Sequence, residues 1–288
     1  MKIFEKIKDM QKWSGAAFKA GKSIGVVPTM GALHEAHGSL IKRARQENDL
    51  VITTVFVNPA QFGPGEDYEA YPRDFNSDRE FCEKEKVDAI FHPSTDEMYA
   101  NPQTVVKIGK LASTMCGAFR PGHFDGVATV VAKLFNITKS TRAYFGLKDY
   151  QQLRIIKQLA VDLNFDLEII GCPIIRESDG LAFSSRNRYL SEDERRRAVY
   201  LNKALKHGWQ LYRKGEKKAG KIAIEIRDII SENTGGKIDY AGVYDADSLE
   251  EISGDIKENI VIAAAVHIGK TRLIDNVSSY EEALSQKK

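Results

Sequence analysis

Short runs of apolar, often β-branched residues alternate with helical patterns up to residue 175, and this alternation restricts the fold more than any other feature. Turn residues bound each run, and the runs cover residues 24–27, 50–57, 89–91, 142–145 and 167–175. Continuous apolar runs of this kind are typical of strands buried on both faces of a sheet. The helical patterns cover residues 39–48, 75–86, 126–136 and 149–163. This order predicts right-handed crossovers and an α/β fold with a doubly wound, parallel, Rossmann-like sheet.

The pattern changes after Ile175, where the turn-forming sequence R-E-S-D-G begins. Ser191 and Glu194 form a capping box that predicts a helix over residues 191–211, and residues 221–230 predict another. A smaller sheet is expected from strands over residues 237–244, 260–267 and 271–277. We therefore expect a Rossmann-like domain over 1–175 and a smaller C-terminal α+β domain over 176–288 that closes over the site.

The start of the chain and its apolar stretches bear on targeting. Residues 1–13 mix charged with apolar positions, which predicts an amphipathic helix and not an apolar signal segment. The longest apolar stretches, 51–57 and 260–266, are far shorter than the roughly 20 residues that span a bilayer. We expect a soluble protein with no membrane partner.

Charge and cysteine content narrow the partners and the compartment. The 42 Lys and Arg residues nearly balance the 40 Asp and Glu residues, for a formal net charge of +2, so no basic nucleic-acid surface is predicted. Cys82, Cys116 and Cys172 are an odd number of widely spaced cysteines with no C-x-x-C pair. They indicate neither a disulfide framework nor a metal cluster, and a cytoplasmic location is expected.

The first segment with chemical potential is P-T-M-G-A-L-H-E-A-H, which follows a predicted strand and enters a helix. His34 and His37 are three residues apart and share one helical face, beside free amides that favour anions, so the pair can bind a phosphate. A zinc pair is an alternative, although no third ligand is evident nearby and the spacing differs from H-E-x-x-H. A simple helix-capping role is the other alternative.

Two further segments follow predicted strands. In F-V-N-P-A-Q-F, Asn58 and Gln61 offer carboxamides to a small polar substrate, or Asn58 merely caps the turn before Pro59. In F-G-L-K-D-Y-Q-Q, Lys148 can meet phosphates and Asp149 can cap the helix or accept a ribose hydroxyl, but a capped helix with an exposed lysine explains the pattern equally well. The usual nucleotide-binding fingerprints are absent.

A fourth segment, F-S-S-R-N-R over residues 183–188, places two hydroxyls beside a guanidinium. Arginine binds phosphate oxygens in bidentate fashion, so the segment can act as a polyphosphate clamp. A solvated turn that leads to the helix capped by Ser191 is the alternative, and the spacing alone does not decide between them.

Together the segments resemble the pantoate–β-alanine ligase family over nearly the whole chain. P-T-M-G-A-L-H-x-x-H, F-V-N-P-x-Q-F, A-Y-P-R-D, R-P-G-H-F, K-D-x-Q-Q and S-S-R-N occur in order with family-like spacing. The resemblance implies a cytoplasmic, homodimeric nucleotidyltransferase-superfamily enzyme with an HIGH-like signature at 34–37. It also implies condensation of (R)-pantoate with β-alanine through a pantoyl adenylate, which yields pantothenate, AMP and pyrophosphate for coenzyme A synthesis.

The resemblance also implies roles for residues. It places His34, His37, Lys148 and Arg186 on the phosphates of ATP, with Mg²⁺ carried by those phosphates and no metal held by the protein itself. The full ATP-binding set is Met30, Gly31, Ala32, Leu33, His34, Glu35, Ala36, His37, Gly146, Leu147, Lys148, Asp149, Ile175, Phe183, Ser184, Ser185 and Arg186. Gln61 and Gln152 match pantoate-binding glutamines. Beside them we expect Asn58 and an apolar wall of Met30, Phe56, Val127, Val130 and Val131, although the valine spacing also fits a core helix.

Three positions depart from the family pattern. Ala36 stands where Gly is frequent, Leu147 replaces a frequent polar residue, and Phe183 replaces a frequent Met. None removes a group with obvious chemistry, so we expect activity to survive.

The alternative functions are another adenylate-forming enzyme for a different short acid, a non-catalytic nucleotide sensor and an RNA-binding protein that keeps the fold. The segment over residues 62–71 is the expected lid.

Overall fold

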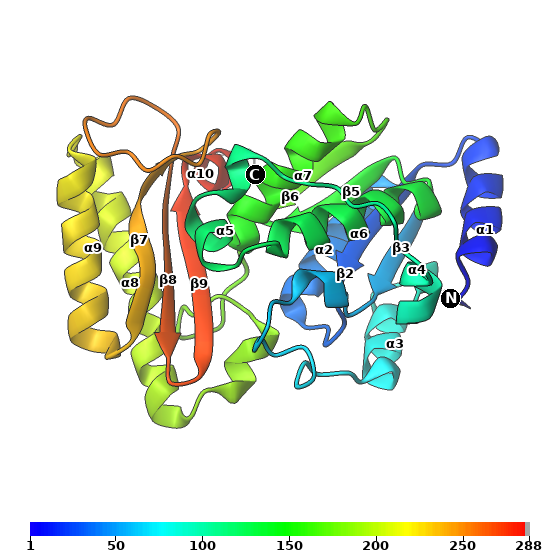
Figure 1. Ribbon diagram of the computed structural model, residues 1–288, viewed down its shortest axis with the longest axis horizontal. Helices are drawn as coiled ribbons and strands as arrows, with labels where there is room; N and C mark the ends of the chain where they lie inside the picture. The colour runs from blue at the N-terminus through cyan, green and yellow to red at the C-terminus, as the bar shows by residue number, and fades with distance from the viewer. Residues whose placement is uncertain (286–288) are drawn as a thin grey trace. The chain divides into compact units, whose positions relative to one another are not determined.

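The computed structural model describes residues 1–285, which divide into two compact units (Figure 1). The first unit contains residues 1–109, 120–146 and 152–172, and the second contains 110–119, 147–151 and the chain from Pro173 onward. No helix among residues 1–285 is both long enough and apolar enough to cross a membrane. The domain boundary near Ile175 stays a prediction.

A parallel sheet of six strands forms the centre of the first unit, in the order β1-β4-β3-β2-β5-β6. The strands are β1 Lys2–Phe4, β2 Ile24–Thr29, β3 Leu50–Val55, β4 Ala89–Phe91, β5 Arg142–Gly146 and β6 Glu168–Cys172. Most residues of β2 to β5 are buried, as the apolar runs predict. The predicted doubly wound α/β fold is therefore confirmed.

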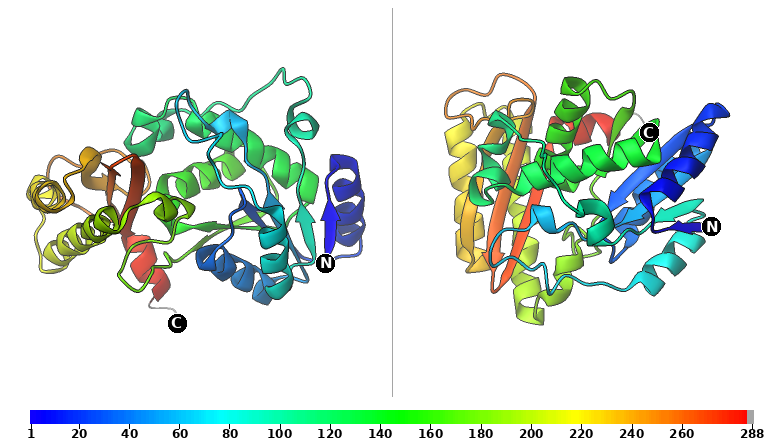
Figure 2. Two further views of the ribbon diagram at one scale, coloured as in Figure 1. Left: turned by 90° about the horizontal axis from the view of Figure 1, so that it is seen from below. Right: turned by 45° about the vertical axis from the view of Figure 1, so that its right-hand side comes forward.

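Helices cover both faces of this sheet (Figure 2). α2 and α3 pack against one face and α6 against the other, where α1 packs on α6. The helices are α1 Ile7–Lys19, α2 Glu35–Glu47, α3 Phe75–Lys84, α4 Thr95–Tyr99, α6 His123–Thr138 and α7 Tyr150–Asp162, with the short η1 Pro59–Gln61.

The helix predicted over residues 1–13 is wrong in its first half. Residues 2–4 form β1, which pairs in parallel with β4 at the edge of the sheet, and α1 begins only at Ile7. Lys2 pairs with Ala89 and Phe4 with Phe91. This pairing gives hydrogen-bond partners to backbone N–H and C=O groups that would lack them at the end of a helix. Pairing with a distant strand therefore overrides the local helical pattern.

The order of the strands fixes where a ligand is expected. From β2 the chain moves outward to β3 and β4, and β5 then pairs on the opposite side of β2. Ligands of open α/β sheets bind beyond the carboxyl ends of the strands at such a switch point. The segment after β2, which contains Met30 and His34, starts at this point.

The second unit is built on an antiparallel sheet of three strands in the order β7-β8-β9. The strands are β7 Lys237–Asp245, β8 Ile260–Ile268 and β9 Thr271–Ser278. α8 Glu192–Arg213 and α9 Ala219–Thr234 pack on one another, with α8 on β8 and α9 on β7. The remaining elements are η2 Lys110–Ala112, α5 Met115–Phe119, η3 Leu147–Asp149, η4 Ser185–Tyr189 and α10 Ser279–Ser285. The capping box that opens α8 forms as predicted, since Ser191 and Glu194 each accept the other's backbone N–H.

Candidate functional site

A tight turn after β2 prepares the start of α2. Gly31 has φ +84° and Ala32 has φ 51°, a left-handed conformation that favours glycine. The Asp78 carboxylate of α3 accepts the N–H groups of Ala32 at 3.0 Å and of Leu33 at 2.7 Å. A Cβ on Gly31 would lie 2.7 Å from Asp78 Oδ2, so the close carboxylate also requires glycine there. Burial raises the pKa of Asp78, and the two N–H groups partly offset that effect.

His34 and His37 lie together at the start of α2. His34 is the N-cap, and its N–H donates to His37 Nδ1 at 3.3 Å, while the two ring centroids are 4.2 Å apart. Because Nδ1 of His37 is the acceptor, a neutral ring carries its proton on Nε2, which is a donor suited to an anion. The structure thus shows the capping geometry, and phosphate binding stays a prediction. Within residues 1–285 no group of three or more His, Cys, Asp or Glu side chains could hold a metal.

Gln61 is held between the turn after β2 and the loop after β3. Its Nε2 lies 3.0 Å from Met30 Sδ, and its Oε1 accepts from Asn58 Nδ2 at 3.1 Å. Asn58 is only 1% exposed, donates also to Gly126 O, and accepts from Tyr99 OH and from the first turn of η1. Asn58 therefore caps η1 and orients Gln61, while its predicted contact with substrate stays a prediction.

The R-P-G-H-F segment fixes the same loop, a role that its sequence alone did not predict. His123 Nδ1 lies 2.7 Å from Gln61 O, and Arg120 donates to both carboxylate oxygens of Glu66 at 2.7 and 2.5 Å. Gly126 permits a close approach, because a Cβ there would lie 2.0 Å from the backbone oxygen of Ala60. The motif marked this segment as important, but its contacts could not be predicted, because His123 and Gln61 are some sixty residues apart in the sequence.

The expected apolar wall divides into buried and half-buried parts. Phe56, directly after β3, is buried, as are Val127, Val130 and Val131 on α6. Met30 is half-buried, and Gln152 is half-buried near the start of α7. In the rest of the first-unit set, Gly31 and Ala32 are buried, Leu33, Ala36 and Gly146 are half-buried, and Glu35 is exposed. The burial of the three valines fits a core helix, and their contact with substrate stays a prediction.

In the second unit, η3 carries Lys148 and Asp149. The Lys148 side chain is 21% exposed, and its Nζ lies 3.9 Å from Asp149 Oδ1, a loose ion pair. Leu147, where the family pattern is frequently polar, is fully buried. Its side chain therefore anchors the turn, and the following lysine stays accessible.

A hairpin leads to the S-S-R-N segment of the second unit. Phe183 N–H donates to Ile175 O at 3.0 Å, and Arg176 and Ala182 form an antiparallel bridge. Ser184 caps η4 by accepting from Arg186 N at 3.2 Å. Phe183, Ser185 and Arg186 are all half-buried. The segment forms a half-buried turn that is capped by Ser184 and leads to α8, and its polyphosphate role stays a prediction.

Cys82, Cys116 and Cys172 are all free thiols and all buried. Burial raises the pKa of Cys82 and of Cys172 to about 12 each. These two thiols stay protonated near neutral pH and are poor nucleophiles.

Comparisons with known proteins identify relatives that cover the whole fold. The family model described as pantoate-beta-alanine ligase matches residues 2–278. The pantothenate synthetase of Caldicellulosiruptor bescii is 52% identical over 278 residues, which cover 96% of this chain and 98% of the relative. That of Thermotoga petrophila is 53% identical over 277 residues and covers 96% of this chain and 99% of its own.

Solved structures agree with the sequence relatives. The pantothenate synthetase of Thermus thermophilus superposes with a TM-score of 0.90 at 39% identity, over 96% of this chain and 99% of its own. A pantoate-beta-alanine ligase from Francisella tularensis, described as a complex with beta-gamma ATP and beta-alanine, has a TM-score of 0.79 at 35% identity. The match covers 96% of this chain and 97% of that one.

Proposed function

Because the chain belongs to the pantoate–β-alanine ligase family, we propose that it uses ATP to form an amide bond between (R)-pantoate and β-alanine. The products are pantothenate, AMP and pyrophosphate, and pantothenate serves coenzyme A synthesis. The observation that carries the proposal is the near full-length family match. The paired histidines at the switch point and the fixed Gln61 support it locally.

In the first proposed step, a pantoate carboxylate oxygen attacks the α-phosphorus of MgATP, and pyrophosphate leaves. Negative charge gathers on the phosphates, so donors that are already in place lower the barrier. His37 Nε2–H and His34 supply donors in the first unit, and Lys148, Ser184, Ser185 and Arg186 supply them in the second. Mg²⁺, when bound, would be held by the phosphate oxygens of the nucleotide, which are ligands that this ion prefers, and it would help to neutralise their charge.

In the second proposed step, the β-alanine amine attacks the pantoyl carbonyl carbon, the bond from that carbon to the adenylate oxygen breaks, and AMP leaves. Gln61 and Gln152 hold the hydroxyls and carboxylate of pantoate by neutral carboxamides. Met30, Phe56 and the three valines of α6 face its gem-dimethyl group. Asp149 accepts a ribose hydroxyl, and backbone groups of Met30, Gly31, Gly146 and Ile175 contact the nucleotide.

We further propose that the enzyme is a cytoplasmic homodimer. The relatives support this only through family membership. Light scattering of the purified chain is expected to give twice the mass of 32.2 kDa. A mass of one chain at micromolar concentration would refute the dimer and leave the reaction untouched.

Product analysis tests the reaction. With MgATP, pantoate and β-alanine, the chain is expected to yield AMP, pyrophosphate and pantothenate in equal amounts. Omission of either acid abolishes pantothenate. ADP and phosphate as products would refute the proposal, and so would turnover with another short acid but not with pantoate. ATP binding without pyrophosphate release would instead indicate a nucleotide sensor.

A further inference from the structure

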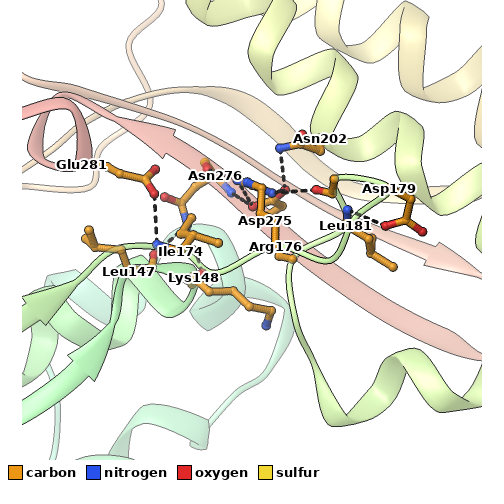
Figure 3. Close-up of polar contacts among 12 residues, drawn as sticks. Leu147, Lys148, Ile174, Arg176, Asp179, Leu181, Asn202, Asp275, Asn276 and Glu281 are labelled. Carbon is orange, nitrogen blue, oxygen red and sulfur yellow. Dashed lines mark hydrogen bonds and ion pairs between the residues drawn. The ribbon is translucent and has the colours of Figure 1, made fainter. Parts of the chain in front are cut away.

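Two adjacent polar residues lie buried in β9, a strand of the second unit. Asp275 is 3% exposed and Asn276 is 2% exposed (Figure 3). Neighbouring residues of a strand point to opposite faces. β9 pairs with β8 along its whole length, which fixes the backbone of both residues. Buried polar groups reduce stability unless partners satisfy them, so the partners of this pair indicate its role.

Asn276 holds the turn that carries Lys148. Its Nδ2 donates to Leu147 O at 2.9 Å and to Lys148 O at 3.0 Å, so both amino hydrogens bind successive carbonyls of η3 (Figure 3). Its Oδ1 is buried and has no hydrogen-bond partner within residues 1–285. An amide with one unsatisfied end is a poor choice for strand stability alone. Its two donors, in contrast, fit the turn.

Asp275 holds the hairpin that leads to Ser184 and Arg186. Arg176, in this hairpin, donates Nη1 to Asp275 Oδ2 at 2.7 Å and Nη2 to Asp275 Oδ1 at 3.1 Å. The Asp275 side chain is 2% exposed and that of Arg176 17%, so water screens the pair weakly. A bidentate pair also fixes orientation. Arg176 Nη1 further donates to Gly180 O at the hairpin tip.

Asn202 of α8 completes this network. Its carboxamide lies against both charged partners (Figure 3), and its Nδ2 donates to Asp275 Oδ2 at 3.3 Å. With the amide turned over, its oxygen accepts from Arg176 Nη1 at 2.7 Å and from Nη2 at 3.1 Å, which suits the guanidinium better. In either orientation the ion pair is enclosed by polar groups that limit its movement.

We propose that Asp275 and Asn276 are positioning residues that set the distance between Lys148 on η3 and the Ser184–Arg186 segment. Consecutive side chains of β9 hold η3 directly, through Asn276, and the hairpin that leads to Ser184, through the contact of Asp275 with Arg176. This inference rests on the proposed function, in which both segments bind the triphosphate of ATP. Donors that stabilise the charge on the phosphates must each be held within about 0.5 Å of the position that the reaction requires. Neither residue needs to touch the nucleotide.

The first variant is Asn276→Ala, which removes both donors to η3. Turnover in pantoate-dependent pyrophosphate release is expected to fall about 100-fold, the effect of misplacing a binding group by about 1 Å. The KM for ATP rises, while the KM for β-alanine is unchanged. Asn233→Ala is the matched control, because its Nδ2 donates to a backbone carbonyl, Ile229 O, in the same unit. The control is expected to keep full turnover.

A double-mutant cycle separates positioning from a general structural role. In a Lys148→Ala background, Asn276→Ala is expected to cause less than about a twofold further loss, because the group it positions is already gone. An equal loss in both backgrounds would overturn the proposal, and so would full turnover of the single variant. A wild-type chain that releases no pyrophosphate with pantoate would instead refute the proposed function.

A second variant, Asp275→Asn, tests the proposal independently if Asn276→Ala folds poorly. Asp275→Asn keeps the shape of the side chain at position 275 but removes its negative charge. Arg176 then contacts only carboxamide groups there, those of the new asparagine and of Asn202. The loss of turnover in Asp275→Asn is expected to vanish in an Arg186→Ala background but to persist in a Gln61→Ala background. Circular dichroism melting verifies the folded state. Equal persistence in both backgrounds contradicts the positioning role.

Discussion

His37 can both cap α2 and donate a hydrogen bond to an anion, the two roles that the sequence motif left open. Its Nδ1 caps α2 by accepting from His34 N–H, and this contact leaves the proton on Nε2 for an anion. The motif revealed both histidines from the sequence, because they are close along the chain. Asp78 could not be found in this way, since the amides that it holds lie 45 and 46 residues away.

The capping and chemical roles of His37 can be separated. His37→Ala is expected to lower pyrophosphate release by about 100-fold or more through loss of a donor to the phosphates. It costs only about 1 kcal/mol of stability through loss of the cap. His37→Gln restores the capping acceptor and therefore the melting temperature, but turnover stays low. Turnover that recovers together with stability would show that the histidine is only a cap.

A control for this prediction lies on α8. His207 is an exposed imidazole whose Nε2 lies 3.4 Å from Glu225. His207→Ala is expected to leave both pyrophosphate release and melting temperature unchanged. Loss of turnover in this variant would mean that removal of any imidazole disturbs the enzyme.

At the scale of elements, apolar runs and capping patterns predict the strands and helices of both units, because these signals are local. The strand β1 and the short helices α4, α5 and α10 were not predicted. β1 is only three residues long and depends on a partner strand 87 residues further along, as the Lys2 to Ala89 pairing shows. The contact between η1 and α6 was equally beyond local patterns, since it depends on a glycine whose neighbour is distant in sequence.

Gly126→Ala tests that contact. The added Cβ would meet Ala60 O at 2.0 Å, so η1 must move away from α6 and shift Gln61. We expect a loss of about 1–3 kcal/mol in the free energy of unfolding, typical of overpacking. Relative to wild type, the KM for pantoate is expected to rise more than the KM for ATP. Gly15→Ala in α1 is the control, because nothing lies within 4 Å of its Cβ. Removal of a helical glycine there is expected to stabilise by about 0.5–1 kcal/mol.

Urea unfolding measures both stabilities, and initial rates give the KM values. Equal stability of the two alanine variants would contradict the close approach of η1 and α6. An unchanged KM for pantoate in Gly126→Ala would show that Gln61 does not depend on this contact.

The Glu66–Arg120 pair predicts a pH effect. Burial alone would raise the pKa of Glu66, but the hydrogen bond and charge of Arg120 outweigh it and hold that pKa below its usual value. A lowered folded-state pKa stabilises the fold above the unfolded pKa of about 4.3, and this contribution is lost as pH falls through the lower folded value. The stability difference between wild type and Glu66→Gln should therefore be larger at pH 7 than at pH 3. A difference independent of pH would contradict the ionised pair.

At the scale of the whole molecule, the ordered motifs led from sequence to family, because several weak signals in one order are jointly specific. Each motif contributes side chains of one unit, and the supports between motifs depend on tertiary structure. Asp275 and Asn276 illustrate this, since neither belongs to a motif. Asn276 nevertheless contacts Lys148 of K-D-x-Q-Q, and Asp275 holds the hairpin that leads to S-S-R-N. Polar residues within a predicted strand were the available signal.

Isotope transfer tests the adenylate mechanism most directly. With pantoate labelled by ¹⁸O in its carboxylate, one labelled oxygen is expected in the phosphate of AMP and the other in the amide of pantothenate. This follows because the carboxylate attacks the α-phosphorus and the carbon–oxygen bond then breaks. Label in inorganic phosphate, or AMP free of label, would contradict the account.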